Sequence, residues 1–170
     1  MYSEENQRDI EARVWELTKD YLRQATPQER HLFVLESNYD GSSSGVRYLV
    51  DDPQLDRATA LALFWRLGAS YYASYDSIDS IPDFQREDYE LINLIATRYC
   101  SGYYANHGIG FDPCKDSGLS PVAGGADSAR SGIDPLMYQA LDGVWARPVG
   151  AYEEGVSLDL FDRIMTVVGN

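Results

Sequence analysis

The sequence predicts a mainly α-helical protein, a single-domain bundle of roughly five to seven helices. Its 170 residues suit one domain, and a hydrophobic content of 44% is enough to fill one sizeable core. Apolar residues recur at spacings of three and four in several segments, and capping or turn residues separate those segments. Together these features exclude a disordered tail, a collagen-like fibre and a coiled-coil rod.

The first predicted helix covers residues 3–24. Ile10, Val14, Leu17 and Tyr21 recur at steps of four, three and four, so they share one face, and charged residues fill the opposite face. This pattern is typical of an amphipathic helix that packs one side against a core.

A capping box predicts the start of the second helix. Thr26 stands at the N-cap, Pro27 at the first helical position and Glu29 at the third, so side chain and backbone can satisfy each other. The helix is expected to end just before a turn in which Asn38 and Asp40 hydrogen-bond the backbone.

The clearest helix is predicted over residues 57–67, after a short loop at 42–45 and an apolar segment at 46–50. The apolar segment fits either a helical turn or a short strand. The helix 57–67 is apolar nearly all round, which predicts a central, buried position. We expect four residues in and beside this helix to act structurally, as its cap, its core and its end: Asp56, Thr59, Trp65 and Gly68.

The second half of the chain contains weaker signals. Asp83 is predicted to cap a helix over 84–101, with Leu91, Ile92, Ile95 and Tyr99 on one face. A glycine-rich loop follows from 102 to 132, with a short extended piece at 108–111. The remaining elements are a short helix over 134–141, a small β-hairpin within 143–156, and a last helix capped by Ser157 with an apolar stripe of Leu158, Phe161, Ile164, Met165 and Val168.

No internal repeat and no linker divides the chain, so one domain is expected over 1–170. We divide it into an N-terminal helix at 1–30, a core at 31–113, a Gly-rich loop at 114–132 and C-terminal helices at 133–170.

The net charge of −13 is spread over the whole chain. Residues 1–85 carry 8 basic and 15 acidic groups, and residues 86–170 carry 6 and 12. Such a surface repels nucleic acid and anionic membranes and favours a basic partner, although acidity also serves solubility alone. The polar N-terminus and the lack of a long apolar run predict a cytoplasmic protein. The oligomeric state is left open.

No residue pattern predicts an enzyme, a cofactor site or a tightly bound metal. The segment 36–41 overlaps half of a calcium loop, but the closing position holds Arg47, a cation, where a bidentate Glu is needed. Cys100, His107 and Cys114 do not have the close ligand pairs of zinc sites. Cys100 is interpreted as a small core residue.

A stretch rich in tyrosine and acid is the candidate for binding a partner. From 67 to 97 the chain has six acidic residues and one basic residue, Arg86, a local charge of −5. Tyrosine supplies amphipathic contact area and carboxylates attract a basic surface. The alternative is a solvated loop with some tyrosines packed in the core. The candidate residues are Tyr71, Tyr72, Tyr75, Asp76, Asp79, Asp83, Glu87 and Asp88.

Two motifs resemble an uncharacterised family of small bacterial domains. They are an Asn-aromatic-Asp turn at Asn38 to Asp40, and a D-x-A-T-A-L-x-x-aromatic-W-x-x-G helix from Asp56 to Gly68. The likeness continues through the runs 98–104 and 109–113, so it covers about 31 to 113. Members of this family look like the small acidic proteins encoded beside secreted bacterial toxins, where immunity proteins are common.

The resemblance, the acidity and the lack of a catalytic motif favour a binding protein. Our leading hypothesis is an immunity protein that neutralises a cognate secreted or polymorphic toxin with a basic surface. The alternatives are a small enzyme with a site in the loop 102–132 and an adaptor module with another protein partner.

Overall fold

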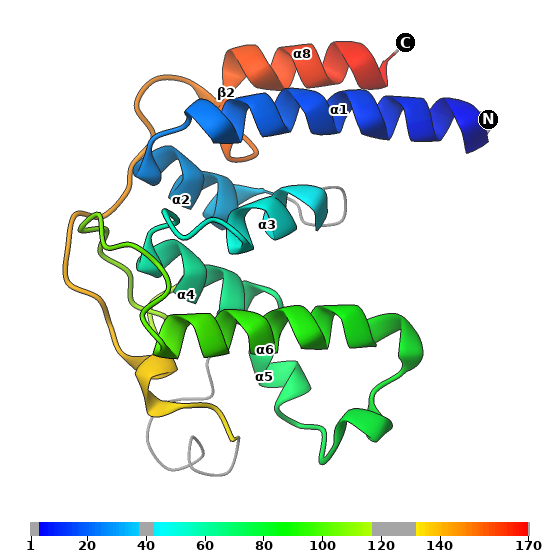
Figure 1. The fold of residues 1–170 in the computed structure, drawn as a ribbon. Coiled ribbons are helices and arrows are strands. Elements are labelled where there is room, and N and C mark those ends of the chain that lie inside the picture. Colours follow the sequence, from blue (N-terminus) through cyan, green and yellow to red (C-terminus); the bar gives the residue numbers. More distant parts are fainter. Residues whose placement is uncertain (1–3, 38–42, 117–131, 170) are drawn as a thin grey trace. The chain divides into compact units, whose positions relative to one another are not determined.

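The mainly α-helical prediction is confirmed by the computed structural model, which describes residues 4–37, 43–116 and 132–169 (Figure 1). These residues form seven α-helices, several short 3₁₀ helices and one two-stranded antiparallel sheet. The chain divides into two compact units. The first unit joins residues 1–52 to residues 146–170, and the second unit consists of residues 53–145. The single domain expected over 1–170 stays a prediction.

The first unit is built on its N-terminal helix. In Figure 1, α1 (Glu4–Gln24) lies alongside the C-terminal helix α8 (Leu158–Val168), and it also contacts α3 (Ser43–Val50). Trp15 on α1 meets the Tyr48 ring on α3 edge to face, with 6.0 Å between ring centroids. Leu22 of α1 is fully buried. The long helix therefore packs on two sides, which matches its broad apolar face.

The predicted capping box opens α2 (Pro27–Glu36). The Glu29 backbone N–H donates to Thr26 Oγ1 over 3.2 Å, and the Thr26 N–H donates to Glu29 Oε2 over 2.7 Å. The other oxygen of Glu29 accepts a hydrogen bond from the Tyr152 hydroxyl over 3.1 Å. The capping carboxylate thus also connects α2 to the hairpin of the same unit.

The segment that fitted either a helical turn or a strand is helical, as part of α3. Val46, Leu49 and Val50 are all buried, and their spacing of three and four puts them on one face of a helix. A strand would turn Val46 and Leu49 to opposite sides. The loop expected over 42–45 is wrong for Ser43 onward, because α3 already begins there.

A hairpin of β1 (Tyr152–Glu153) and β2 (Val156–Ser157) precedes α8, at the end of the range in which a hairpin was predicted. Its turn needs glycine: Gly155 has φ +79°, and a Cβ there would lie 2.8 Å from the Phe33 Cα. Glycine is required because this conformation strains other residues and no space exists for a side chain.

The predicted apolar stripe of α8 is not its buried face: none of the five stripe residues is buried, although Phe161 and Ile164 are half-buried. Leu160 and Val167 are the buried residues, whereas Leu158, Met165 and Val168 are 43–50% exposed. The helix has a wide apolar surface, and only one side of it packs within the unit. Sequence periodicity alone therefore predicted the wrong side of the helix to be buried. Ser157 stands at the N-cap, but its side chain makes no capping hydrogen bond.

The second unit surrounds α4 (Arg57–Arg66), the helix predicted to be central. Eight consecutive residues from Ala58 to Trp65 are buried, and α4 packs against α5 (Ala69–Tyr72) and α6 (Arg86–Cys100). Gly68 has φ +93°, which ends α4 and turns the chain into α5. The indole N–H of Trp65 donates to the Met137 carbonyl over 2.7 Å.

Two expectations for the second unit need correction. Asp83 does not cap α6: it begins a 3₁₀ turn, η3 (Asp83–Gln85), and the N-cap position of α6 is Gln85. The Asp83 carboxylate instead pairs with Arg86, 3.2 Å away. The short helix predicted over 134–141 is only the 3₁₀ helix η4 (Pro135–Tyr138).

The remaining backbone of the second unit is irregular or extended. A further 3₁₀ helix, η2 (Ile78–Ser80), lies between α5 and η3. The piece at 108–111 is extended as predicted: Ile109 bridges Val144, and Phe111 bridges Leu141. Among the described residues, no helix is long and apolar enough to cross a membrane.

Candidate binding surface

Four tyrosines of the second unit form one cluster. Tyr71 and Tyr72 come from α5, Tyr75 follows that helix, and Tyr89 lies on α6. The Tyr71 ring meets those of Tyr72 and Tyr75 edge to face, at centroid distances of 5.1 and 5.4 Å, and Tyr72 lies 6.0 Å from Tyr89. Tyr72 is buried, whereas Tyr71 is 48% exposed. The cluster therefore has an anchored inner side and an accessible outer side.

Hydrogen bonds hold the outer tyrosines in place. The hydroxyls of Tyr71 and Tyr75 are 2.6 Å apart, and the Tyr71 hydroxyl also donates to Gln85 Oε1 over 3.2 Å. The hydrogen bond with Tyr71 raises the pKa of Tyr75. Burial raises the pKa of Tyr72, and the nearby Asp88 carboxylate raises it further. The hydroxyls of Tyr72 and Tyr75 therefore stay protonated at neutral pH and can donate hydrogen bonds.

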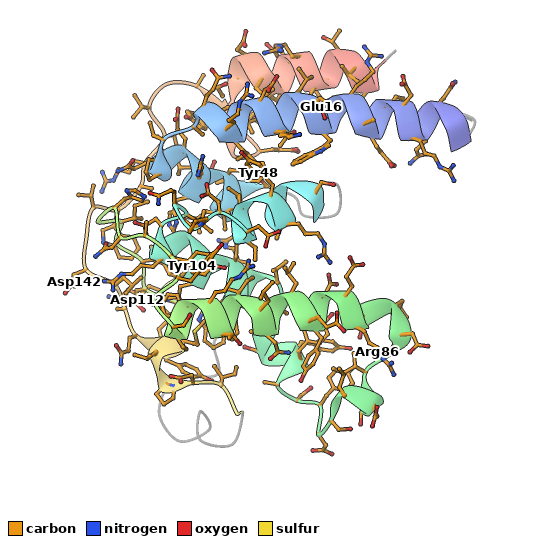
Figure 2. All side chains as sticks on the ribbon, in the orientation of Figure 1. Glu16, Tyr48, Arg86, Tyr104, Asp112 and Asp142 are labelled. Atoms are coloured by element: carbon orange, nitrogen blue, oxygen red, sulfur yellow. The ribbon has the colours of Figure 1, made fainter. Side chains whose placement is uncertain are left out.

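The predicted acidic residues of this stretch are all exposed: Asp76, Asp79, Asp83, Glu87 and Asp88. The basic residue among them, Arg86, lies at the start of α6 (Figure 2), where it pairs with Asp83. The local charge therefore stays strongly negative. We call the segment of residues 71–90 the tyrosine–acid surface.

Two apolar residues of this surface were missed by the sequence analysis. Phe84 in η3 is 82% exposed and Ile78 in η2 is 44% exposed, while Ile81 between them is buried. The signal was weak: each stands alone among polar residues, without the periodicity that marks a buried face. Such exposed apolar groups beside carboxylates are suited to contact with another protein.

The helix motif that carried the resemblance is placed in the interior. Asp56 is 1% exposed; its carboxylate accepts from the Ala58 N–H over 2.7 Å and from the His107 backbone N–H over 2.5 Å. Thr59 and Trp65 are buried as well. The predicted turn residues Asn38 and Asp40 lie outside the described residues.

The Cys–His set forms no site in the described part of the chain. His107 Nε2 lies 2.9 Å from the Gln54 carbonyl, so the side chain supports a loop. Cys100 is exposed, so the interpretation as a core residue is wrong: it stands at the end of α6, off the face of Leu91, Ile92 and Ile95. Partial burial and the neighbouring Asp134 raise its thiol pKa. Over residues 4–37, 43–116 and 132–169, no three His, Cys, Asp or Glu residues are grouped as metal ligands would be.

An open polar hollow of the first unit lies between α1, the start of α2 and the start of α8. Two of its acidic side chains already have contacts: Glu29 belongs to the capping box, and Asp20 pairs with Arg23 at 3.2 Å. The lining residues are Leu17, Asp20, Tyr21, Gln24, Ala25, Glu29, Ser157, Asp159, Leu160 and Arg163.

Comparison with known proteins finds a family match for part of the chain and no activity. No curated protein and no solved structure matches the chain. Residues 25–100 match a family model described as a domain of unknown function (DUF4274), a segment that includes the helix motif and the tyrosine–acid surface. Residues 25–100 thus match an uncharacterised domain family, as the motif from Asp56 to Gly68 predicted.

Proposed function

We propose that this chain is a cytoplasmic immunity protein, which binds and neutralises a bacterial toxin that has a basic surface. The observation that carries the proposal is the tyrosine–acid surface of the second unit. It combines six carboxylates, one cation and an ordered tyrosine cluster within twenty residues. The resemblance to proteins encoded beside toxin genes supplies the class of partner.

The charge of the surface suits rapid capture of a basic protein. The side chain of Asp83 is 92% exposed, and Asp76 and Asp79 also face water. Exposed charges of one sign steer an oppositely charged partner and raise its association rate, an effect that salt screens over about 8–10 Å. An immunity protein benefits from such steering, because it must bind its toxin before the toxin acts.

The tyrosines provide contact area that is already ordered. Tyr71 is held by Tyr75 and Gln85, so little side-chain freedom is lost when a partner covers it. Tyrosine is also enriched among the residues that dominate binding energy at protein interfaces. Charge therefore governs encounter, while the tyrosine cluster governs the lifetime of the complex.

The test uses the toxin encoded beside the gene for this chain. Co-expression should protect cells from that toxin, and surface plasmon resonance should show direct binding. Replacing Asp76, Asp79 and Asp83 together by Asn should lower the association rate about tenfold at low salt and weaken its salt dependence.

A matched control neutralises three exposed carboxylates elsewhere: Asp142→Asn, Glu153→Gln and Asp162→Asn. Asp142 lies toward the end of α6 that is opposite to Arg86 (Figure 2). The control variant has the same total charge as the test variant. If both variants associate equally slowly, the effect belongs to total charge and not to this surface. If the wild-type chain neither binds the toxin nor protects cells, the immunity proposal is wrong.

A further inference from the structure

We infer that Phe84 is the apolar anchor of the tyrosine–acid surface, and that it inserts into an apolar pocket rimmed by Lys and Arg side chains on a partner protein. This inference rests on the proposed function, because it uses the same surface. It adds a residue outside the predicted set and a specific chemistry for the partner.

The exposure of Phe84 is the first argument. At 82%, it is the most exposed aromatic side chain among the residues that the structure describes. Trp145 and Tyr71 follow at 53% and 48%. A phenyl ring in water is unfavourable, so covering it with a complementary pocket contributes directly to binding.

The second argument is the fixed position of the turn that carries the ring. On one side, Ile81 is 2% exposed and anchors the chain. On the other side, the Gln85 N–H donates to the Pro82 carbonyl over 2.9 Å, and the Gln85 side chain accepts from Tyr71. Phe84 is therefore displayed on a turn that is anchored at both ends, which lowers the entropy lost on binding.

The charges around Phe84 define the rim of the partner's pocket. Asp83 precedes the ring, Asp79 lies on the preceding turn and Glu87 lies on the first turn of α6; all three are exposed. Arg86 is already paired with Asp83. An acidic or phosphate-rich partner would be repelled, whereas a pocket bordered by Lys or Arg is complementary.

The experiment selects ligands for the full-length chain from a phage-displayed library of random peptides, with the Phe84→Ala variant as counter-selection. The peptides that survive should combine an aromatic or Leu residue with flanking Lys or Arg. Their Kd should rise at least about 30-fold for Phe84→Ala, which is about 2 kcal/mol at 1.4 kcal/mol per tenfold change and is the size of an interface hot spot. Val149→Ala is the matched control, because Val149 is 89% exposed and belongs to the first unit; it should bind these peptides as the wild type does.

Two outcomes of the peptide selection would overturn the inference. One is that no peptide survives the counter-selection. The other is that Phe84-dependent peptides are acidic or uncharged. Circular dichroism of Phe84→Ala should match the wild type, since the ring contributes little to the core. Protection from the toxin is measured separately. If Phe84→Ala still protects cells, Phe84 is not the anchor, and the immunity proposal stands. If peptides bind through Phe84 but the wild-type chain gives no protection, the immunity proposal is wrong, and the role of Phe84 as an anchor stands.

Discussion

Replacing Asp56 separates the two things that its buried carboxylate does. One oxygen caps α4 through the Ala58 N–H, and the other accepts from the backbone N–H of His107, 51 residues further along the chain. Asp56→Ala removes both acceptors. Loss of a cap costs about 1 kcal/mol, and loss of a charged acceptor for the His107 amide costs about 1–3 kcal/mol. The expected decrease in the free energy of unfolding is therefore about 2–4 kcal/mol.

Asp56→Asn separates the contribution of the helix cap from that of the His107 hydrogen bond. Its amide oxygen still accepts from Ala58, but its NH₂ group meets the His107 N–H, which is also a donor. We expect Asp56→Asn to lose mainly the tertiary part, about 1–3 kcal/mol. His107→Ala keeps the backbone N–H and removes only an exposed side chain bonded to Gln54, so it should cost less than about 1 kcal/mol.

The assay is urea denaturation followed by circular dichroism at 222 nm, with the slope of the transition compared between variants. If Asp56→Ala unfolds within about 0.5 kcal/mol of the wild type, the carboxylate is not a structural cap, because surface substitutions have effects of that size. Asp56 would then have to be reconsidered as a functional residue of the family motif.

Two further predictions concern the cores and caps. Trp65→Ala should destabilise the chain by about 3–5 kcal/mol, because the ring is buried. Trp65→Phe should cost about 1–3 kcal/mol, because Phe leaves the Met137 carbonyl without its donor. A loss below about 1 kcal/mol for Trp65→Ala in the same assay would contradict the burial of this ring. The Thr26 backbone N–H holds the pKa of Glu29 below its ordinary value of 4.5, so the stability that Glu29 contributes is present above pH 4.5 and is lost as pH falls through the lower native pKa. Glu29→Gln should therefore flatten the loss of stability on acidification below pH 4.5, measured by denaturation midpoints, and an unchanged acid profile would show that Glu29 has no part in it.

The elements that the sequence predicted best are those whose signals are local. The capping box joins residues only three apart, Thr26 and Glu29, and its hydrogen bonds form within one helical turn. The helix from Asp56 to Gly68 has its cap, its apolar interior and its terminal glycine in one short run. The same run carried the resemblance that the family match confirmed.

The expectations that failed are those for which several local solutions were equally good. Asp83 is an acceptable cap for α6, but the chain makes a 3₁₀ turn there, and the carboxylate pairs with Arg86. Cys100 lies in an apolar helical stretch, yet the face of α6 that packs is the one carrying Leu91 and Ile95. Neither choice is encoded in the few residues around each site.

By itself, the sequence determined the helical class, the position of α4, the caps of α2 and α4, the acidity of residues 67–97 and the family motif. Only the tertiary structure decided which side of α8 is buried, that Ser43–Val50 is helical, that Asp56 accepts from His107, and that Phe84 is exposed. The physical reason is the distance along the chain between interacting groups. A cap or a terminal glycine is complete within one turn, whereas burial and buried hydrogen bonds depend on partners that only the folded chain brings together.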